Sequence, residues 1–371
     1  MKKKIIVIGG GYAGLKFIES IKNYEVTLID KNLYHYMQTE SYNYVTGRLN
    51  SADITTSLEN FCRFYDVKYI NDEVSYVKDK SIVCKKGEFY YDYLIIACGA
   101  EDFMPKGFEK YSYKIKNLNS AFEYKKSVLQ KLFDYVTEHK ISTLVIGGAG
   151  QSGVELAGEL AVVFKEHKKE GVVSKDFKIV LVEAKKEVLP EMPEYFRINA
   201  KKRLEELEVE LILGKKITDI DKETVYLEDE KIKYDLFIFL GGIAPNNLIK
   251  NLNFEKERGF LKVDEYLKVN EKIFAIGDCA VIKNKKGEIL PPTAQIAEQS
   301  AQYVAKYLMG SKKKFDGKIV GMFCAVGGKW AVGNIGRIYF KGYFAYLIKK
   351  MITKIYAMGI KIKANSGYEK R

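Results

Sequence analysis

The sequence predicts an α/β protein with two Rossmann-like domains, the second inserted into the first, and a C-terminal amphipathic helical segment. Three observations support this fold class. A G-x-G-x-x-G motif occurs twice, at residues 9–14 and 148–153. Each copy follows a short apolar run and precedes a helix-forming stretch, a context that raises such a motif above a chance match. A late apolar run ends in Gly277-Asp278, after the second copy.

The first motif, Gly9-Gly10-Gly11-Tyr12-Ala13-Gly14, follows apolar residues 5–8, and the next apolar run ends at Asp30. In such a unit the glycines allow a tight turn and let the backbone approach a pyrophosphate at a helix N-terminus. The acid accepts hydrogen bonds from ribose hydroxyls. We therefore expect a dinucleotide to bind at Gly9, Gly11, Gly14 and Asp30.

The second motif repeats this arrangement. Gly148-Ala149-Gly150-Gln151-Ser152-Gly153 follows residues 143–146, and Glu183 closes the next apolar run. Two complete motifs predict two dinucleotides in one chain. A 2′-phosphate would lie against the Glu183 carboxylate, so NADH is expected in preference to NADPH, although Lys185 and Lys186 weaken that preference.

The remaining apolar runs complete two similar units. Residues 93–97 end in small residues, as do residues 236–240 before Gly241-Gly242. An internal duplication of βαβ units accounts for the similarity. Because Gly277-Asp278 comes after the second unit, the first domain is expected to comprise residues 1–108 and 252–320. The second is then 109–251, and a C-terminal segment covers 321–371.

Composition narrows the function classes. The formal charge of +13 comes from lysines interleaved with acids along all 371 residues. This charge fits either a generally lysine-rich surface or a surface that faces an anionic membrane. No nucleic-acid-binding module is recognisable in the sequence. The five cysteines contain no C-x-x-C pair, which fits a reducing compartment and argues against a neighbouring dithiol relay. No metal site is expected.

The C-terminal segment has a different pattern. Apolar residues recur at helical spacing, and lysines flank them. The apolar set is Phe344, Leu347, Ile348, Met351, Ile352, Ile355 and Met358, and the lysines are Lys349, Lys350, Lys354 and Lys361. No run reaches the length of a membrane-spanning helix. The pattern alone leaves open whether this helix packs on the body or lies in a membrane interface.

On these motifs the chain resembles the two-dinucleotide flavoproteins and, within them, type II NADH dehydrogenases, the non-proton-pumping NADH:quinone oxidoreductases. The general motifs are residues 9–14 with Asp30, residues 93–99 and residues 276–278. The more specific motifs are Asn32-Leu33-Tyr34-His35 with Gln38, Thr46-Gly47, residues 148–160 and residues 294–299. Two positions depart from the family pattern: Cys98 replaces the usual threonine, and Ser300 a usual glutamine.

The resemblance implies FAD at the first motif, held non-covalently, with Asp278 on its ribityl chain, and NADH at the second as substrate. It extends the cofactor-binding set to Tyr12, Ala13, Lys31, Val74, Ala97, Gly99, Gln151, Ser152 and Gly242. It also places Glu155, Gln295 and Gln299 at the flavin, as the catalytic candidates. From position alone, Glu155 in the first turn of its helix could instead stabilise the helix N-terminus.

The function implied is hydride transfer from NADH to FAD, followed by delivery of two electrons to a membrane quinone. The C-terminal helix would hold the protein peripherally on the cytoplasmic face of the cell membrane, with Lys349 and Lys350 at anionic headgroups. A chain truncated before Lys341 is expected to become soluble and keep FAD. The sequence leaves the quinone and the oligomeric state open, and a homodimer is compatible with it.

Three other functions remain open. A sulfide:quinone oxidoreductase shares the fold but needs reactive cysteines around the flavin. A soluble reductase of a ferredoxin- or rubredoxin-like carrier would lack a use for the lysine-flanked helix. A flavoprotein that senses NADH and regulates a partner would show no steady-state turnover with quinone.

Overall fold

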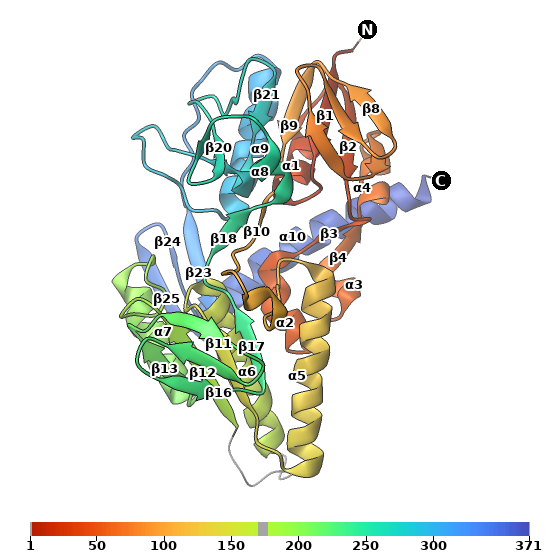
Figure 1. Ribbon diagram of the computed structural model, residues 1–371. Helices are drawn as coiled ribbons and strands as arrows, with labels where there is room; N and C mark the ends of the chain where they lie inside the picture. Colours follow the sequence, from red (N-terminus) through yellow and green to blue (C-terminus); the bar gives the residue numbers. More distant parts are fainter. Residues whose placement is uncertain (1, 170–176, 371) are drawn as a thin grey trace.

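The computed structural model describes residues 2–169 and 177–370 (Figure 1). The first sheet is parallel, with the strand order β21-β9-β1-β2-β5. Its strands are β1 (Lys4–Ile8), β2 (Glu25–Asp30), β5 (Lys68–Asn71), β9 (Tyr93–Ile96) and β21 (Ile273–Ala275). Their apolar side chains are buried on both faces, as expected for parallel strands. Helices α1 (Tyr12–Ser20), α4 (Leu58–Phe64) and α9 (Ala294–Leu308) cover one face, and strands β6 (Val74–Val77) and β7 (Ser81–Cys84) with helix α8 (Asn247–Asn251) cover the other. Because β21 lies far along the chain, the first sheet is completed only after the second.

The second sheet repeats this arrangement with the strand order β13-β12-β11-β17, again all parallel. Its strands are β11 (Thr143–Gly147), β12 (Lys178–Glu183), β13 (Glu210–Leu213) and β17 (Leu236–Phe239). Read from β17, the order matches that of β9-β1-β2-β5 in the first sheet. The predicted fold class of two Rossmann-like units is confirmed.

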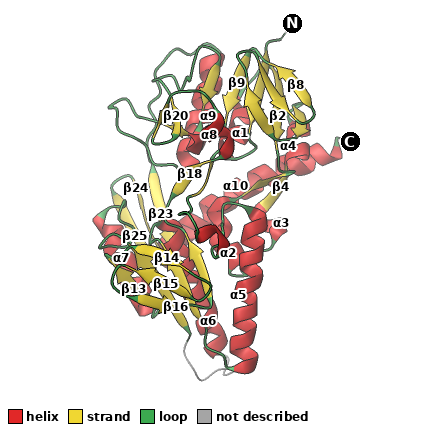
Figure 2. Ribbon diagram, viewed as in Figure 1, coloured by secondary structure: helices red, strands yellow, loops and turns green. Residues whose placement is uncertain are grey.

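The helices cover the sheets and connect the units (Figure 2). They are α1 (Tyr12–Ser20), α2 (Ser41–Val45), α3 (Ser51–Ile54), α4 (Leu58–Phe64), α5 (Leu118–Glu138), α6 (Gln151–Lys169), α7 (Glu194–Glu206), α8 (Asn247–Asn251), α9 (Ala294–Leu308) and α10 (Tyr343–Glu369), with 3₁₀ turns η1 (Gln38–Glu40), η2 (Phe108–Lys110) and η3 (Gly277–Cys279). Helix α1 packs on α9 beside the first sheet, and α6 packs on α7 beside the second.

Short antiparallel strands form the smaller sheets. They are β3 (Tyr34–Tyr36) with β4 (Thr55–Ser57); β6 (Val74–Val77), β7 (Ser81–Cys84) and β8 (Gly87–Tyr90); β10 (Ala100–Asp102) with β18 (Ile243–Pro245); β14 (Ile217–Ile220), β15 (Thr224–Leu227) and β16 (Lys231–Lys233); and β23 (Gly321–Ala325), β24 (Ala331–Ile335) and β25 (Ile338–Gly342). Strands β19 (Lys256–Glu257) and β20 (Phe260–Lys262) pair antiparallel, and β20 also pairs parallel with β22 (Ala280–Val281).

Helix α10 crosses the back of the molecule from the β23–β25 sheet to α4 (Figure 1). One face of it is part of the protein core. Ile360 and Ala364 are buried in the same apolar cluster as residues of α1 and α9. A Cβ on Gly367 would lie 1.8 Å from the Asn60 carbonyl oxygen, so only glycine allows this close approach of α10 to α4.

The other face of α10 is exposed. Six of the seven apolar residues predicted to share one face are more than two-fifths exposed, all except Ile348: Phe344, Leu347, Met351, Ile352, Ile355 and Met358. The helix therefore both packs on the body and presents an unpartnered apolar face. In residues 2–169 and 177–370, no helix is long and apolar enough to span a bilayer.

These contacts correct two expectations about the C-terminal segment. Removing everything from Lys341 onward would expose the core around α4 and α9, so the truncated chain should not keep a stable FAD site. In addition, residues 321–342 form a three-stranded sheet that packs on α6 and α7. The segment 321–371 is therefore not a membrane helix alone.

Candidate active site

The first glycine loop is held under the first sheet by backbone contacts. Gly9 has a φ of 105°, and its N–H donates to the Ile29 carbonyl at 2.9 Å. A Cβ on Gly14 would lie 1.9 Å from the Gly9 carbonyl oxygen, which explains why the third motif position is glycine. Asp30 accepts hydrogen bonds from the N–H groups of Gly10 at 2.6 Å and Asn32 at 2.7 Å. Burial nevertheless raises the pKa of the Asp30 carboxyl above its ordinary value.

The second glycine loop repeats these contacts. Gly148 has a φ of 102° and donates to the Val182 carbonyl at 2.7 Å. A Cβ on Gly153 would lie 1.9 Å from the Gly148 carbonyl oxygen. Glu183 accepts from the N–H groups of Ala149 at 2.7 Å and Lys185 at 2.9 Å. Each acid is thus held by two backbone N–H groups at the edge of its glycine loop, and both acids line the cavity.

One cavity of about 1710 Å³ joins both loops. It exceeds the roughly 300–1,000 Å³ of a typical small-molecule pocket, as a site for two dinucleotides requires. Most of the predicted site residues line it: Gly9, Gly11, Tyr12, Ala13, Asp30, Lys31, Val74, Ala97, Gly99, Gly148, Gly150, Gln151, Ser152, Glu155, Glu183, Gly242, Asp278 and Gln295. Gly14, Gly153 and Gln299 lie outside the lining, and the two glycines instead bring helix and loop together.

Glu155 lies in this cavity wall with an unexpected partner. Its carboxylate is ion-paired with Lys349 of α10 and accepts from the Gln151 amide at 3.1 Å and from the Ala325 N–H at 3.2 Å. Helix α6 begins at Gln151, so Glu155 lies beyond the first turn. The sequence-based placement of Glu155 in the first turn of its helix is therefore wrong. The hydrogen bonds of the Glu155 carboxylate do not cap the N-terminus of α6.

Lys349 corrects a second expectation, because it is 8% exposed rather than at the headgroups. Its Nζ also lies 4.7 Å from the centre of the Tyr42 ring. Burial lowers the pKa of this ammonium, but attraction to Glu155, with smaller effects of Tyr42 and Glu40, outweighs burial and leaves the pKa raised. Lys349 therefore stays protonated in the cavity wall.

The two predicted glutamines of α9 hold the backbone that leads into β23. The Gln295 side-chain oxygen accepts from the Val320 N–H at 2.6 Å. The Gln299 amide accepts from the Lys318 N–H at 3.0 Å and donates to the Lys318 carbonyl at 2.9 Å. Gln295 lines the cavity and Gln299 does not, so a catalytic role for Gln299 stays a prediction without direct geometric support.

Ser300 replaces the family's usual glutamine and has a defined place. It is fully buried, and its hydroxyl accepts from the Gly277 N–H at 3.2 Å and donates to the Ala297 carbonyl at 2.9 Å. The bond from the Gly277 N–H to the Ser300 hydroxyl fixes the turn that carries Asp278. The Asp278 carboxylate faces the cavity, 3.7 Å from the Lys116 ammonium.

His35 connects the first loop to α10. Its Nδ1 lies 3.0 Å from the Gly10 carbonyl oxygen, and its Nε2 lies 3.0 Å from the Tyr356 hydroxyl. The Tyr356 ring also lies 4.9 Å from the Tyr12 ring. Burial lowers the pKa of His35 to about 4, so the ring is neutral and can donate from one nitrogen while accepting at the other.

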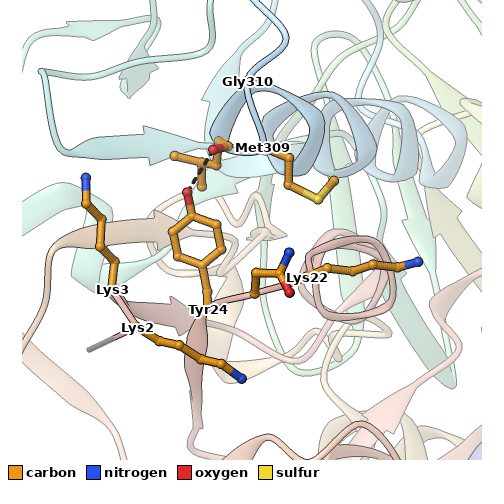
Figure 3. A pocket seen from close by; sticks show the side chains of 8 residues that line it. Lys2, Lys3, Lys22, Tyr24, Met309 and Gly310 are labelled. Atoms are coloured by element: carbon orange, nitrogen blue, oxygen red, sulfur yellow. Dashed lines mark hydrogen bonds between the residues drawn. The ribbon is translucent and has the colours of Figure 1, made fainter.

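A second, more open depression of about 830 Å³ lies away from this site (Figure 3). It is bounded by Lys2, Lys3 and Lys22, and the Tyr24 hydroxyl donates to the Leu308 carbonyl at 2.7 Å beneath it. None of the predicted functional residues lines it.

The fold and the paired loops define an oxidoreductase of the two-dinucleotide class. The chain belongs to the pyridine nucleotide-disulphide oxidoreductase family, whose sequence profile matches residues 3–301. The type II NADH:quinone oxidoreductase of Staphylococcus aureus (strain NCTC 8325 / PS 47) is 29% identical over 394 aligned residues, which cover 98% of each chain.

Solved structures agree in fold. NDH2 from Plasmodium falciparum, determined in complex with NADH, has a TM-score of 0.87 at 22% identity and covers 100% of this chain and 98% of its own. The sulfide:quinone oxidoreductase of Aquifex aeolicus has a TM-score of 0.80 at 20% identity and covers 97% and 92%. The resemblance to type II NADH dehydrogenases inferred from the motifs is confirmed.

Proposed function

We propose that this protein is a FAD-dependent NADH:quinone oxidoreductase that does not pump protons. The observation that carries the proposal is the single cavity that joins the two glycine loops, since it lets two dinucleotides meet. Transfer of a hydride needs alignment at about 3–3.5 Å more than it needs an acid or a base. The protein's task is therefore to position the reactants.

The residues present fit FAD at the first loop and NADH at the second. Asp30 lies where a ribose hydroxyl would be bound, and Asp278 faces the cavity on the same side. Glu183 lies at the equivalent position of the second loop. When bound, FAD supplies the capacity to accept a hydride from NADH and to release two electrons to an acceptor.

Glu155 and Lys349 supply a buried charge pair in the wall of this cavity. Reduction of a quinone to a quinol takes up two protons with the two electrons. Because the pKa of Lys349 is raised, its ammonium, held in place by Glu155, keeps its proton and supplies a fixed positive charge in the cavity wall rather than a proton for the quinone. We assign Glu155 to binding and positioning of the reactants, with Lys349 as its partner.

The preference for NADH is supported by how nearby lysines are engaged. Lys185, which could attract a 2′-phosphate, is ion-paired with Glu191. Lys215 lies 2.9 Å from both Asp229 and Glu230. These acids reduce the positive charge that Lys185 and Lys215 would offer to a 2′-phosphate, which favours NADH at Glu183.

The exposed apolar face of α10 supports a peripheral position on the membrane surface, and we assign it to the cytoplasmic face because NADH is a cytoplasmic substrate. Ile352 is half exposed on this face and also lines the cavity, beside Thr353. A lipid-dissolved quinone could therefore pass from the membrane to the site beside α10. Burying each large apolar side chain in the interface contributes about 1.5–3 kcal/mol.

This position is tested by sedimentation with vesicles that contain anionic lipid. Ile355→Glu, at a position 65% exposed on α10, should weaken vesicle binding at least about tenfold. Ile198→Glu, at a position 59% exposed on α7, is the matched control and should bind like the wild type. Equal binding of both variants would remove α10 from the interface.

The activity is tested by NADH oxidation with a short-chain quinone, compared with a ferredoxin, a rubredoxin and, as an alternative electron donor, sulfide. Rapid turnover with NADH and quinone is expected, with slow or no turnover of the other combinations. Faster turnover with a protein carrier would favour the soluble reductase, and sulfide-dependent quinone reduction would favour the sulfide enzyme.

A further inference from the structure

Two cysteines that are far apart in sequence meet at the end of the first sheet. Strands β9 and β21 are parallel neighbours, with Ile96 opposite Ala275. Cys98 follows β9 and Cys279 follows β21, and Cys98 packs against the apolar cluster that contains Cys279. The Cys279 Sγ lies 3.2 Å from the carbonyl oxygen of Ile96, two residues before Cys98, and each of the two thiols shifts the pKa of the other. The missing C-x-x-C motif argued against a dithiol of residues close together in sequence, and this pair of distant cysteines was not predicted.

The two thiols have different surroundings. Cys279 is fully buried, and its Sγ lies 3.2 Å from the carbonyl oxygens of both Ile96 and Ile276, which accept from it. Cys98 lines the large cavity together with Asn246, whose amide donates to the Cys98 carbonyl at 3.0 Å. One thiol can thus meet a small reagent from the cavity, and the other is held behind it.

The electrostatic surroundings support the same division. The neighbouring Cys279 thiol lowers the pKa of the Cys98 thiol despite burial, and the Cys98 thiol together with burial raises the pKa of Cys279. By contrast, burial raises the pKa of Cys62 to about 12 and that of Cys84 to about 11. Of these four thiols, Cys98 lines the cavity, whereas the other three are buried elsewhere. Because the thiolate is the nucleophile, access and the lowered pKa together make Cys98 the most reactive.

We propose that Cys98 and Cys279 form a peroxide-sensitive thiol pair, in which Cys98 reacts first and Cys279 resolves it to a disulfide. The Cys98 sulfur attacks one oxygen of hydrogen peroxide and the O–O bond breaks, which leaves a sulfenic acid on Cys98. The departing hydroxide takes up the former thiol proton and leaves as water. The Cys279 thiol then attacks the sulfur of the Cys98 sulfenic acid, and a second water leaves. Two thiols and one peroxide give one disulfide and two waters.

The disulfide would join the end of β9 to η3, the turn that carries Asp278 on the cavity wall. The pair is therefore placed to report oxidation directly to the first dinucleotide site. The proposal does not depend on the electron acceptor, since its chemistry involves only the two thiols and peroxide.

The test uses the full-length, FAD-containing protein treated with hydrogen peroxide, alkylated and analysed by peptide mass spectrometry. Two of the five free thiols should be lost, a Cys98–Cys279 linked peptide should appear, and dithiothreitol should restore both thiols. Oxidation of the exposed Met351 and Met358 shows that peroxide has acted. No linked peptide under these conditions overturns the proposal.

Variants separate the two roles. Cys98→Thr should prevent the linked peptide and leave Cys279 reduced, whereas Cys84→Ser, a control at another buried cysteine, should form the link like the wild type. Cys279→Ser should accumulate a Cys98 sulfenic acid that dimedone traps. If Cys279→Ser does not fold, the first two variants still decide. A link that survives in Cys98→Thr, or its loss in Cys84→Ser, contradicts the assignment.

Discussion

The two glycine loops have nearly the same backbone but different surroundings. Gly9 and Gly148 have φ angles of 105° and 102°, and in both loops the third motif glycine lies against the first. In the first loop, however, Tyr12 is partly covered, and His35 ties the loop to Tyr356 of α10. In the second, the start of α6 at Gln151 and Ser152 is exposed.

This difference teaches what the motif alone does not determine. The glycine motif predicts that a dinucleotide binds, but the elements around it determine whether that dinucleotide is retained or exchanged. A loop covered by α10 suits a resident cofactor such as FAD. A loop with an exposed helix start suits a substrate such as NADH, which must bind and leave in every turnover.

The largest expected effect comes from the charge pair beside the second loop. Lys349→Met leaves the buried Glu155 carboxylate without its partner, and breaking such a pair costs about 3–5 kcal/mol. Urea unfolding should show this loss, and the double variant Glu155→Gln with Lys349→Met should recover part of it. Turnover should fall in both single variants. Lys350→Met, at the exposed neighbouring position, is the control and should change stability by less than about 0.5 kcal/mol. If Lys349→Met lowers the free energy of unfolding no more than Lys350→Met does, the Glu155–Lys349 pair does not stabilise the fold.

The next effect concerns the covered first loop and depends on pH. Burial holds the pKa of His35 at about 4, below its ordinary 6.5, so the unfolded chain binds this proton more tightly. The stabilising contribution is full above pH 6.5 and is lost as the pH falls toward 4, in total about 3 kcal/mol. His35→Gln should flatten the fall in unfolding free energy over this range, and His139→Gln, at an exposed histidine, should not. Parallel pH profiles for all three proteins would contradict the burial argument.

Variants of Asp30 and Glu183 distinguish retention of FAD at the first loop from recognition of NADH at the second. Losing a charged hydrogen bond costs about 1.5–3 kcal/mol, so Glu183→Ala should raise the KM for NADH about ten- to a hundredfold and narrow the preference over NADPH. The protein should stay yellow. Asp30→Ala should instead lower the FAD content of the purified protein. Wild-type use of NADPH equal to that of NADH would refute the role of Glu183.

The smallest effect tests the shared backbone geometry. Gly14→Ala and Gly153→Ala each place a Cβ 1.9 Å from a carbonyl oxygen in the undisturbed structure. Relief of such overlap costs about 1–3 kcal/mol, or about 5- to 150-fold in affinity. Gly14→Ala should weaken FAD binding, and Gly153→Ala should weaken NADH binding alone, as measured by fluorescence titration. Loss of both ligands in either variant would show that the loops are not independent.

Local patterns predicted the parts of this site that local contacts build. The strand, glycine loop, helix and acid of each unit lie close together in sequence, and each follows from backbone geometry. Partners distant in the chain could not be predicted: Glu155 and Lys349 are 194 residues apart, and His35 and Tyr356 are 321 apart. Lys349 was misassigned because a lysine in an amphipathic helix is usually solvated. The small residues Ala345, Ala364 and Gly367 marked the packed face of α10, and Lys349 shares it.

The central claim is that the two loops bring NADH and FAD together and pass electrons to quinone. Anaerobic stopped-flow absorbance of the purified yellow protein tests it most directly. NADH alone should bleach the flavin absorbance within one turnover, and a short-chain quinone added afterwards should restore it fully. A flavin that NADH leaves unbleached, or a bleached flavin that quinone does not reoxidise, would contradict the account.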